Sequence, residues 1–172
     1  VLGTLPYILA LDPEGNETPF VVAPDSPYLE LYERFRSNLR RASDKPLKVV
    51  LFTSTVSQEG KSVSAYNLAI ASARAGKRTL LIEADLRSPS LAKALKVAPD
   101  PDAAVEPLRY YGSLSECVRL VPEVENLYLV PSPGPMRQPA AVLESSEFHR
   151  LIEDARGRFD MVILDTPAMS LC

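Results

Sequence analysis

Tryptophan is absent from this chain, histidine occurs once, at His149, and the two cysteines, Cys117 and Cys172, lie far apart. Two cysteines without a pattern are too few for a disulfide framework or a zinc site, and they favour a reducing compartment. No apolar run approaches the roughly 20 residues of a membrane span, and no signal peptide is recognisable. The formal net charge is only −3, which argues against a broad nucleic-acid-binding surface.

What the chain does contain is the composition of an ordinary globular domain. Its 172 residues are 46% hydrophobic and 24% charged, which suits one domain with a full core. We predict a single nucleotide-binding domain over residues 1–172, with an N-terminal strand and helix in 1–45 and the core in 46–172. Because the sequence begins at Val1 and stops at Cys172, we expect it to be a piece of a longer protein that lacks the C-terminal portion of the fold.

Apolar runs and helical patterns alternate along the core. Buried strands are predicted over 47–54, 78–87, 126–132 and 160–167, and helices over 24–43, 62–77, 88–97, 114–121 and 140–159. This alternation predicts an α/β fold, a P-loop NTPase-like parallel sheet flanked by helices on both faces. Ligands of such sheets bind beyond the carboxyl ends of the strands, where segments 53–62, 83–89 and 165–170 would meet.

The first of these segments resembles a phosphate-binding loop. Gly60, Lys61 and Ser62 match the end of the pattern G-x-x-x-x-G-K-[ST], although Thr55 stands at the first glycine. Backbone N–H groups at a helix N-terminus bind anions, a lysine contacts the β- and γ-phosphates, and a serine ligates Mg²⁺. The predicted nucleotide-binding residues are Ser57, Gln58, Glu59, Gly60, Lys61, Ser62 and Val63. The alternative is a strand-to-helix turn with a solvated lysine.

Carboxylates stand at the ends of two of the predicted strands. Glu83 and Asp85 follow one apolar run, and Asp165 follows another. Buried carboxylates are costly unless they serve a cation or a proton transfer. We therefore predict Ser62, Asp85 and Asp165 as metal-binding residues and Lys61, Glu83 and Asp85 as catalytic ones. The alternatives are strand-end carboxylates paired with Arg87 or Lys77, and an Asp165 that caps a turn.

Three segments together carry a family resemblance: "SQEGKS", "LLIEADLRSP" and "VILDTPAMS". They resemble the Walker A, D-x-D-x-R and D-x-x-P elements of the bacterial tyrosine kinases, the cytoplasmic ATP-binding modules of Wzc-type polysaccharide co-polymerases. That family often lacks the first glycine of the loop. The resemblance implies a tyrosine autokinase that uses ATP and Mg²⁺ in exopolysaccharide or lipopolysaccharide biosynthesis. It also implies location at the cytoplasmic face of the inner membrane, a membrane-anchored co-polymerase half as fused or separate partner, and a homo-oligomer. From the net charge, we expect no nucleic-acid partner.

The sequence departs from the family pattern at several positions. Ser57 and Gln58 replace a usual Pro-Gly, Glu83 replaces the first Asp of the D-x-D pair, Ala168 replaces a common proline, and Glu33 reverses a charge in the E-x-x-R-x-x-R helix motif used for ring assembly. A catalytically degenerate regulatory or assembly module is therefore an alternative. A third is a partition- or division-type switch ATPase, but that class has a second lysine early in its loop. Whether the chain is an enzyme stays open at this point.

Overall fold

The computed structural model describes residues 26–56, 60–87, 91–97 and 105–169, together with positions 5, 10, 11, 14, 17, 18, 89 and 103. Near the amino end, β1 (Ala10–Leu11) and β2 (Glu17–Thr18) form a short antiparallel pair. Most of the segment expected to hold the first strand lies outside the described residues. Among the helices that the structure describes, none is long and apolar enough to cross a membrane.

The core is a five-stranded sheet in the order β3-β7-β4-β6-β5. Its strands are β3 (Val49–Phe52), β4 (Thr79–Glu83), β5 (Arg119–Leu120), β6 (Leu127–Val130) and β7 (Met161–Asp165). All neighbours pair in parallel except β5, which runs antiparallel to β6 at the edge. The predicted α/β fold class is thus confirmed, with one antiparallel edge strand added.

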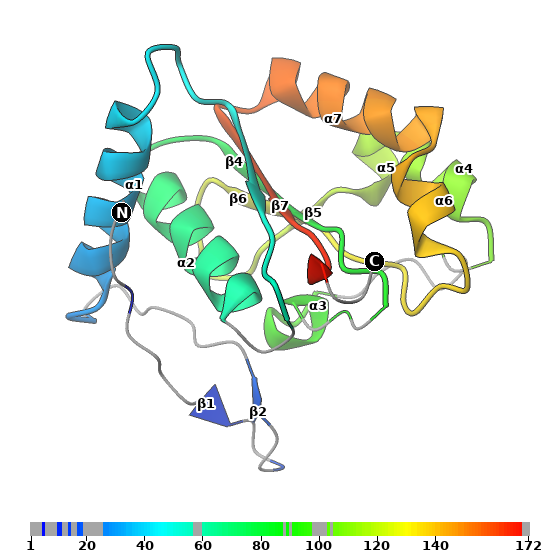
Figure 1. Ribbon diagram of the computed structural model, residues 1–172, viewed down its shortest axis with the longest axis horizontal. Helices are drawn as coiled ribbons and strands as arrows, with labels where there is room; N and C mark the ends of the chain where they lie inside the picture. Colours follow the sequence, from blue (N-terminus) through cyan, green and yellow to red (C-terminus); the bar gives the residue numbers. More distant parts are fainter. Residues whose placement is uncertain are drawn as a thin grey trace.

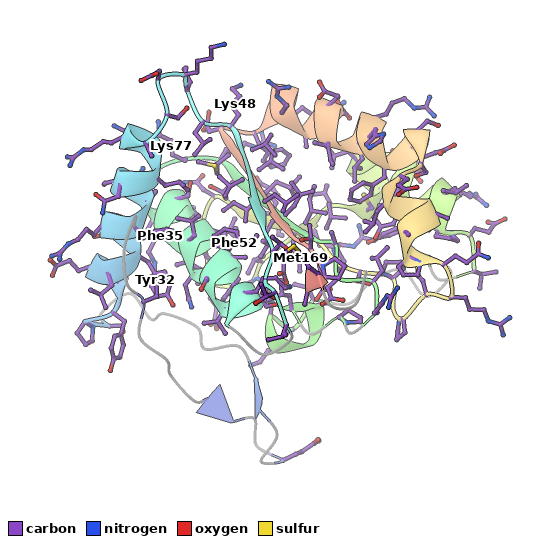
Figure 2. The ribbon with its side chains drawn as sticks, in the orientation of Figure 1. Tyr32, Phe35, Lys48, Phe52, Lys77 and Met169 are labelled. Atoms are coloured by element: carbon purple, nitrogen blue, oxygen red, sulfur yellow. The ribbon has the colours of Figure 1, made fainter. Side chains whose placement is uncertain are left out.

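One face of the sheet is covered by α2 (Lys61–Arg74), which is itself covered by α1 (Leu29–Arg41), while α3 (Leu91–Ala94) follows β4 (Figure 1). Every residue of α2 from Ala65 to Ala73 is buried. This all-round burial explains why the helix is rich in alanine and serine, since small residues fit between two packed layers. Figure 2 shows Tyr32 and Phe35 of α1 on the side that faces α2, and Tyr32 is only 1% exposed.

The other face is covered by α4 (Pro107–Tyr111), α5 (Leu114–Cys117), α6 (Pro139–Leu143) and α7 (Ser146–Arg158). Alternate strand residues such as Leu80, Ile82 and Val162 pack with these helices, whereas Leu81 and Ile163 pack with α2. Because both faces of the sheet pack against helices, the strands are continuous hydrophobic runs in the sequence.

Three predicted helices differ from the structure. The one expected over 88–97 corresponds to α3, which ends at Ala94. The helix expected over 114–121 ends at Cys117, because Val118 adopts extended backbone angles and the chain continues into β5. The single helix expected over 140–159 is broken into α6 and α7. The break lies at Ser145, whose hydroxyl accepts a hydrogen bond from the Phe148 N–H and so caps α7.

Candidate functional site

Three loops meet at the carboxyl edge of the sheet, as predicted. The N–H of Thr166 donates to the carbonyl of Phe52 at 3.1 Å, and the N–H of Met169 donates to the carbonyl of Ser54 at 2.8 Å. The N–H of Ala84 donates to the carbonyl of Asp165, also at 2.8 Å. These bonds continue the parallel pairing of β3, β7 and β4 past the strand ends, so they hold the loops after all three strands in one place.

Helix α2 begins at this edge in a form suited to anions. Its N-cap, Gly60, has φ +77°, a left-handed conformation that favours glycine. No side chain of the described residues caps this end, and the first turn holds no acidic residue. The first N–H groups of a helix have no intrahelical partner, so those from Lys61 through Val63 can bind an external anion. Ser57, Gln58 and Glu59 lie outside the described residues.

Lys61, Ser62 and Asp165 converge directly above this helix end. The ammonium of Lys61 lies 2.5 Å from Oδ1 of Asp165 and 3.9 Å from Oδ2 of Asp85. The hydroxyl of Ser62 donates to Oδ2 of Asp165 at 2.6 Å. The structure therefore brings together Lys61, Ser62, Asp85 and Asp165, which were predicted from three separate motifs.

Asp165 is 1% exposed, and its environment sets its protonation. Burial raises the pKa of its carboxyl above the ordinary value, although Lys61 and the hydrogen bonds from Lys61 and Ser62 oppose that rise. The nearby Asp85 raises the pKa further. Asp165 is therefore a buried acid whose charged form depends on neighbouring cations and donors.

The donor set fits a magnesium ion. The hydroxyl of Ser62 and the carboxylates of Asp85 and Asp165 are hard oxygen ligands, which Mg²⁺ prefers together with water and substrate phosphates. Within the described part of the chain, no cluster of three or more His, Cys, Asp or Glu side chains forms a complete all-protein metal site. A metal here would thus take the rest of its ligands from phosphate and water.

Glu83 lies on the same face of the sheet, in register with Asp165 on the neighbouring strand. Its side chain is 1% exposed. Oε2 accepts hydrogen bonds from the N–H groups of Leu91 at 2.5 Å and Ala92 at 3.4 Å, and Oε1 accepts one from the N–H of Ser132 at 2.9 Å. Burial raises the pKa of this carboxyl, while the three backbone donors lower it and Asp165 raises it.

These partners of Glu83 were missed in the sequence. Every residue except proline carries the same backbone N–H, so the sequence does not identify Leu91 or Ser132 as hydrogen-bond donors. The only available signal was the combination of a carboxylate at a buried strand end with a short helix eight residues later.

A separate groove of about 490 Å³ lies at the opposite edge of the sheet. It is formed by the carboxyl-terminal parts of α1 and α2, the segment before β3 and the start of β7; its basic lining residues are Arg36, Arg40, Lys45, Lys48 and Lys77. Figure 2 shows Lys48 and Lys77 on this side of the molecule. Because the groove lies at the amino ends of the strands, it takes no part in the site built around Lys61.

The sequence of the chain matches an established family. The family described as the CobQ/CobB/MinD/ParA nucleotide binding domain matches residues 50–164. This range contains the helix α2 start, Glu83, Asp85 and the apolar strand that leads to Asp165.

Individual relatives carry the resemblance to tyrosine kinases and confirm it. The chain is 37% identical over 145 residues to the tyrosine-protein kinase YwqD of Bacillus subtilis, covering 84% of this chain and 60% of that protein. It is 35% identical over 154 residues to the succinoglycan biosynthesis transport protein ExoP of Rhizobium meliloti, covering 85% of this chain but only 19% of ExoP. The chain therefore spans about three fifths of YwqD and a small part of ExoP.

Among solved structures, the kinase domain of the Escherichia coli tyrosine kinase ETK superposes with a TM-score of 0.82. The match covers 100% of this chain and 71% of that domain, at 21% sequence identity. At this identity the likeness shows a shared fold.

Proposed function

Since the chain belongs to the CobQ/CobB/MinD/ParA nucleotide-binding family, we propose that it binds ATP or ADP with Mg²⁺ and forms the nucleotide-binding part of a bacterial tyrosine autokinase of exopolysaccharide or lipopolysaccharide biosynthesis. One observation carries the proposal: Lys61, Ser62, Asp85 and Asp165 converge at the N-terminus of α2. The names of the tyrosine-kinase relatives supply the reaction type.

Each of these side chains has a proposed role in phosphoryl transfer, in which catalysis consists mostly of positioning and charge stabilisation. Lys61 contacts the β- and γ-phosphates, and the backbone N–H groups from Ser57 to Val63 bind the phosphate oxygens. Ser62 ligates Mg²⁺, and Asp85 and Asp165 hold its remaining shell. Bound Mg²⁺ would neutralise the negative charge that develops on the phosphates.

A tyrosine kinase transfers its phosphoryl group to tyrosine hydroxyls, so the exposure of the tyrosines in this chain shows which of them could be acceptors. Four of those that the structure describes are buried: Tyr32 at 1%, Tyr66 at 2%, Tyr110 at 8% and Tyr111 at 1% exposure. Tyr110 donates its hydroxyl to the carbonyl of Pro131, and both Tyr110 and Tyr111 pack edge-on in an aromatic cluster with Phe148. We infer that these four are structural and that the acceptor tyrosines are not among them.

The wider setting is proposed from the relatives. ExoP is a transport protein of succinoglycan biosynthesis, and this chain corresponds to a small part of it. We infer that the domain works with a membrane-anchored co-polymerase half, fused or separate, at the cytoplasmic face of the inner membrane, and that it self-associates. Fractionation of cells that express the full-length protein, with and without its co-polymerase partner, tests this placement.

The proposed reaction is tested by label transfer from γ-labelled ATP in the presence of Mg²⁺. The protein is this chain extended to its natural carboxyl terminus, compared with Lys61→Met, which removes the ammonium but retains an unbranched side chain of similar length. We expect label on tyrosine in the first protein and at least a hundredfold less in the variant, because Lys61 stabilises the transferring charge. Absence of label from both folded proteins would refute kinase activity and leave the regulatory module as the function.

A further inference from the structure

We propose that Glu83 is a positioning residue, whose carboxylate ties the end of β4 to the first turn of α3 and to the segment after β6. The tie fixes the loop that carries Asp85. Its effect on phosphoryl transfer rests on the proposed function, whereas the tie itself does not.

The geometry of the carboxylate supports a structural tie. Its two oxygens accept three backbone hydrogen bonds, from Leu91, Ala92 and Ser132, at 2.5, 3.4 and 2.9 Å. The donors lie eight, nine and 49 residues further along the chain. Hydrogen bonds to a charged acceptor are stronger than neutral ones, so one buried side chain joins the end of β4, the first turn of α3 and the segment after β6.

A second connection joins two of these segments. The N–H of Met136 donates to the carbonyl of Leu86 at 2.9 Å, which links the segment after β6 to the loop after β4 a second time. Between these two links, the hydroxyl of Ser132 accepts a hydrogen bond from the N–H of Gly134 at 3.2 Å. The loop that holds Asp85 is thereby attached to the segment after β6 on both sides of Asp85, at Glu83 and at Leu86.

The same contacts make Glu83 poorly suited to act as a general base. A base needs an oxygen within hydrogen-bond reach of the substrate proton, but both oxygens of Glu83 already accept N–H groups and the side chain is 1% exposed. Asp85 is more open, with a side chain 15% exposed, and lies 3.9 Å from the Lys61 ammonium. We therefore assign Glu83 to holding the loop and leave Asp85 as the carboxylate that faces the reacting groups.

This role explains why a glutamate is suited to the position. Replacing Glu83 with aspartate would withdraw the carboxylate by roughly 1.5 Å, the length of one C–C bond. That shift exceeds what hydrogen bonds of normal length tolerate, so at least one of the three segments would be released. A general base would behave differently, since an aspartate in its place would retain a carboxylate that can accept a proton.

The test compares Glu83→Asp and Glu83→Gln with Glu153→Asp, a matched control at an exposed glutamate of α7. Amide hydrogen exchange at Leu91 and Ser132 is measured by NMR, and nucleotide KM, kcat and their pH profiles are measured on the full-length protein. We expect exchange at both amides to rise about tenfold or more in both Glu83 variants, because each loses part of the tie. Nucleotide KM should rise, the acidic limb of the kcat profile should keep its midpoint, and the control should match the unmodified protein.

The opposite results would overturn the inference. A Glu83→Asp protein with unchanged exchange and undiminished label transfer, beside a Glu83→Gln protein with unchanged exchange and no transfer, would identify Glu83 as the base. If neither variant folds, the unmodified protein tests the tie: the amides of Leu91 and Ser132 should exchange at least tenfold more slowly than the amide of Glu125, an exposed turn residue. Equal rates would refute the tie. If the unmodified protein transfers no label, the proposed function fails while the exchange data still decide the tie.

Discussion

The ammonium of Lys61 lies 2.5 Å from Oδ1 of Asp165, and the two side chains are only 9% and 1% exposed. Removing one partner of such a pair leaves an uncompensated buried charge, which costs far more than the pair contributes as a whole. The Lys61–Asp165 contact is therefore a sensitive point in the stability of the fold as well as the centre of the candidate site.

We expect Asp165→Ala to lower the free energy of unfolding by about 3 kcal/mol, because Lys61 keeps only the more distant Asp85 and Ser62 loses its acceptor. Urea unfolding followed by circular dichroism measures the change. Asp154→Ala is the control, since it breaks an exposed pair with Arg158 and should cost about 0.5 kcal/mol or less. Equal losses in the two variants would contradict the buried charge pair.

Gly60 offers a test of the loop backbone. Its φ of +77° is strained for any residue with a Cβ, although nothing within 4 Å would clash with that atom. We expect Gly60→Ala to destabilise the protein by about 1 kcal/mol and to weaken nucleotide binding measured by calorimetry. Gly157→Ala in α7 also meets no neighbour within 4 Å and has no positive φ, so it should be stabilising by up to about 1 kcal/mol. A Gly60→Ala protein that gains stability like the control would refute the left-handed backbone.

The raised pKa of Glu83 predicts a pH dependence of stability. The carboxyl binds its proton more tightly in the folded protein than in the unfolded chain, whose ordinary value is 4.5. The free energy of unfolding contributed by this group therefore falls as the pH rises above about 4.5 and levels off above the folded pKa. Urea unfolding at a series of pH values measures this dependence. The free energy of unfolding should fall less steeply with pH in Glu83→Gln than in the unmodified protein. Glu153→Gln should leave the slope unchanged, and an unaltered slope in both variants would contradict the prediction.

Much of the fold and the core of the site could be predicted from the sequence because both have strong local signals. A strand buried on two faces reads as an apolar run, so the runs that end at Phe52, Glu83 and Asp165 fixed three neighbouring strands and placed their carboxyl ends together. Gly60, Lys61 and Ser62 carry a motif whose glycine has the left-handed conformation that the turn requires. These features depend on residue type, which the sequence shows directly.

The remaining features depend on contacts that residue type does not reveal. Glu83 is held by backbone groups up to 49 residues away, and those groups are alike in nearly every residue. Strand β5 has two residues, too few for a periodic pattern. The break between α6 and α7 falls at Ser145, where helical periodicity continues on both sides and a serine cap is the only local sign.

That cap can be tested directly. Ser145 accepts a hydrogen bond from the Phe148 N–H at 3.2 Å and donates one to the carbonyl of Val142 at 2.6 Å, so it holds the end of α6 and the start of α7 together. We expect Ser145→Ala to lower the free energy of unfolding by about 1 kcal/mol. Ser146→Ala is the control, because the exposed Ser146 hydroxyl donates to the side chain of the adjacent Glu147 and caps no helix. Urea unfolding measures both losses, and amide exchange at Phe148 should rise only in the Ser145 variant. If the two serines prove equivalent in both measurements, residues 139–158 behave as one continuous helix, and the periodicity of the sequence describes this segment better than the capped break does.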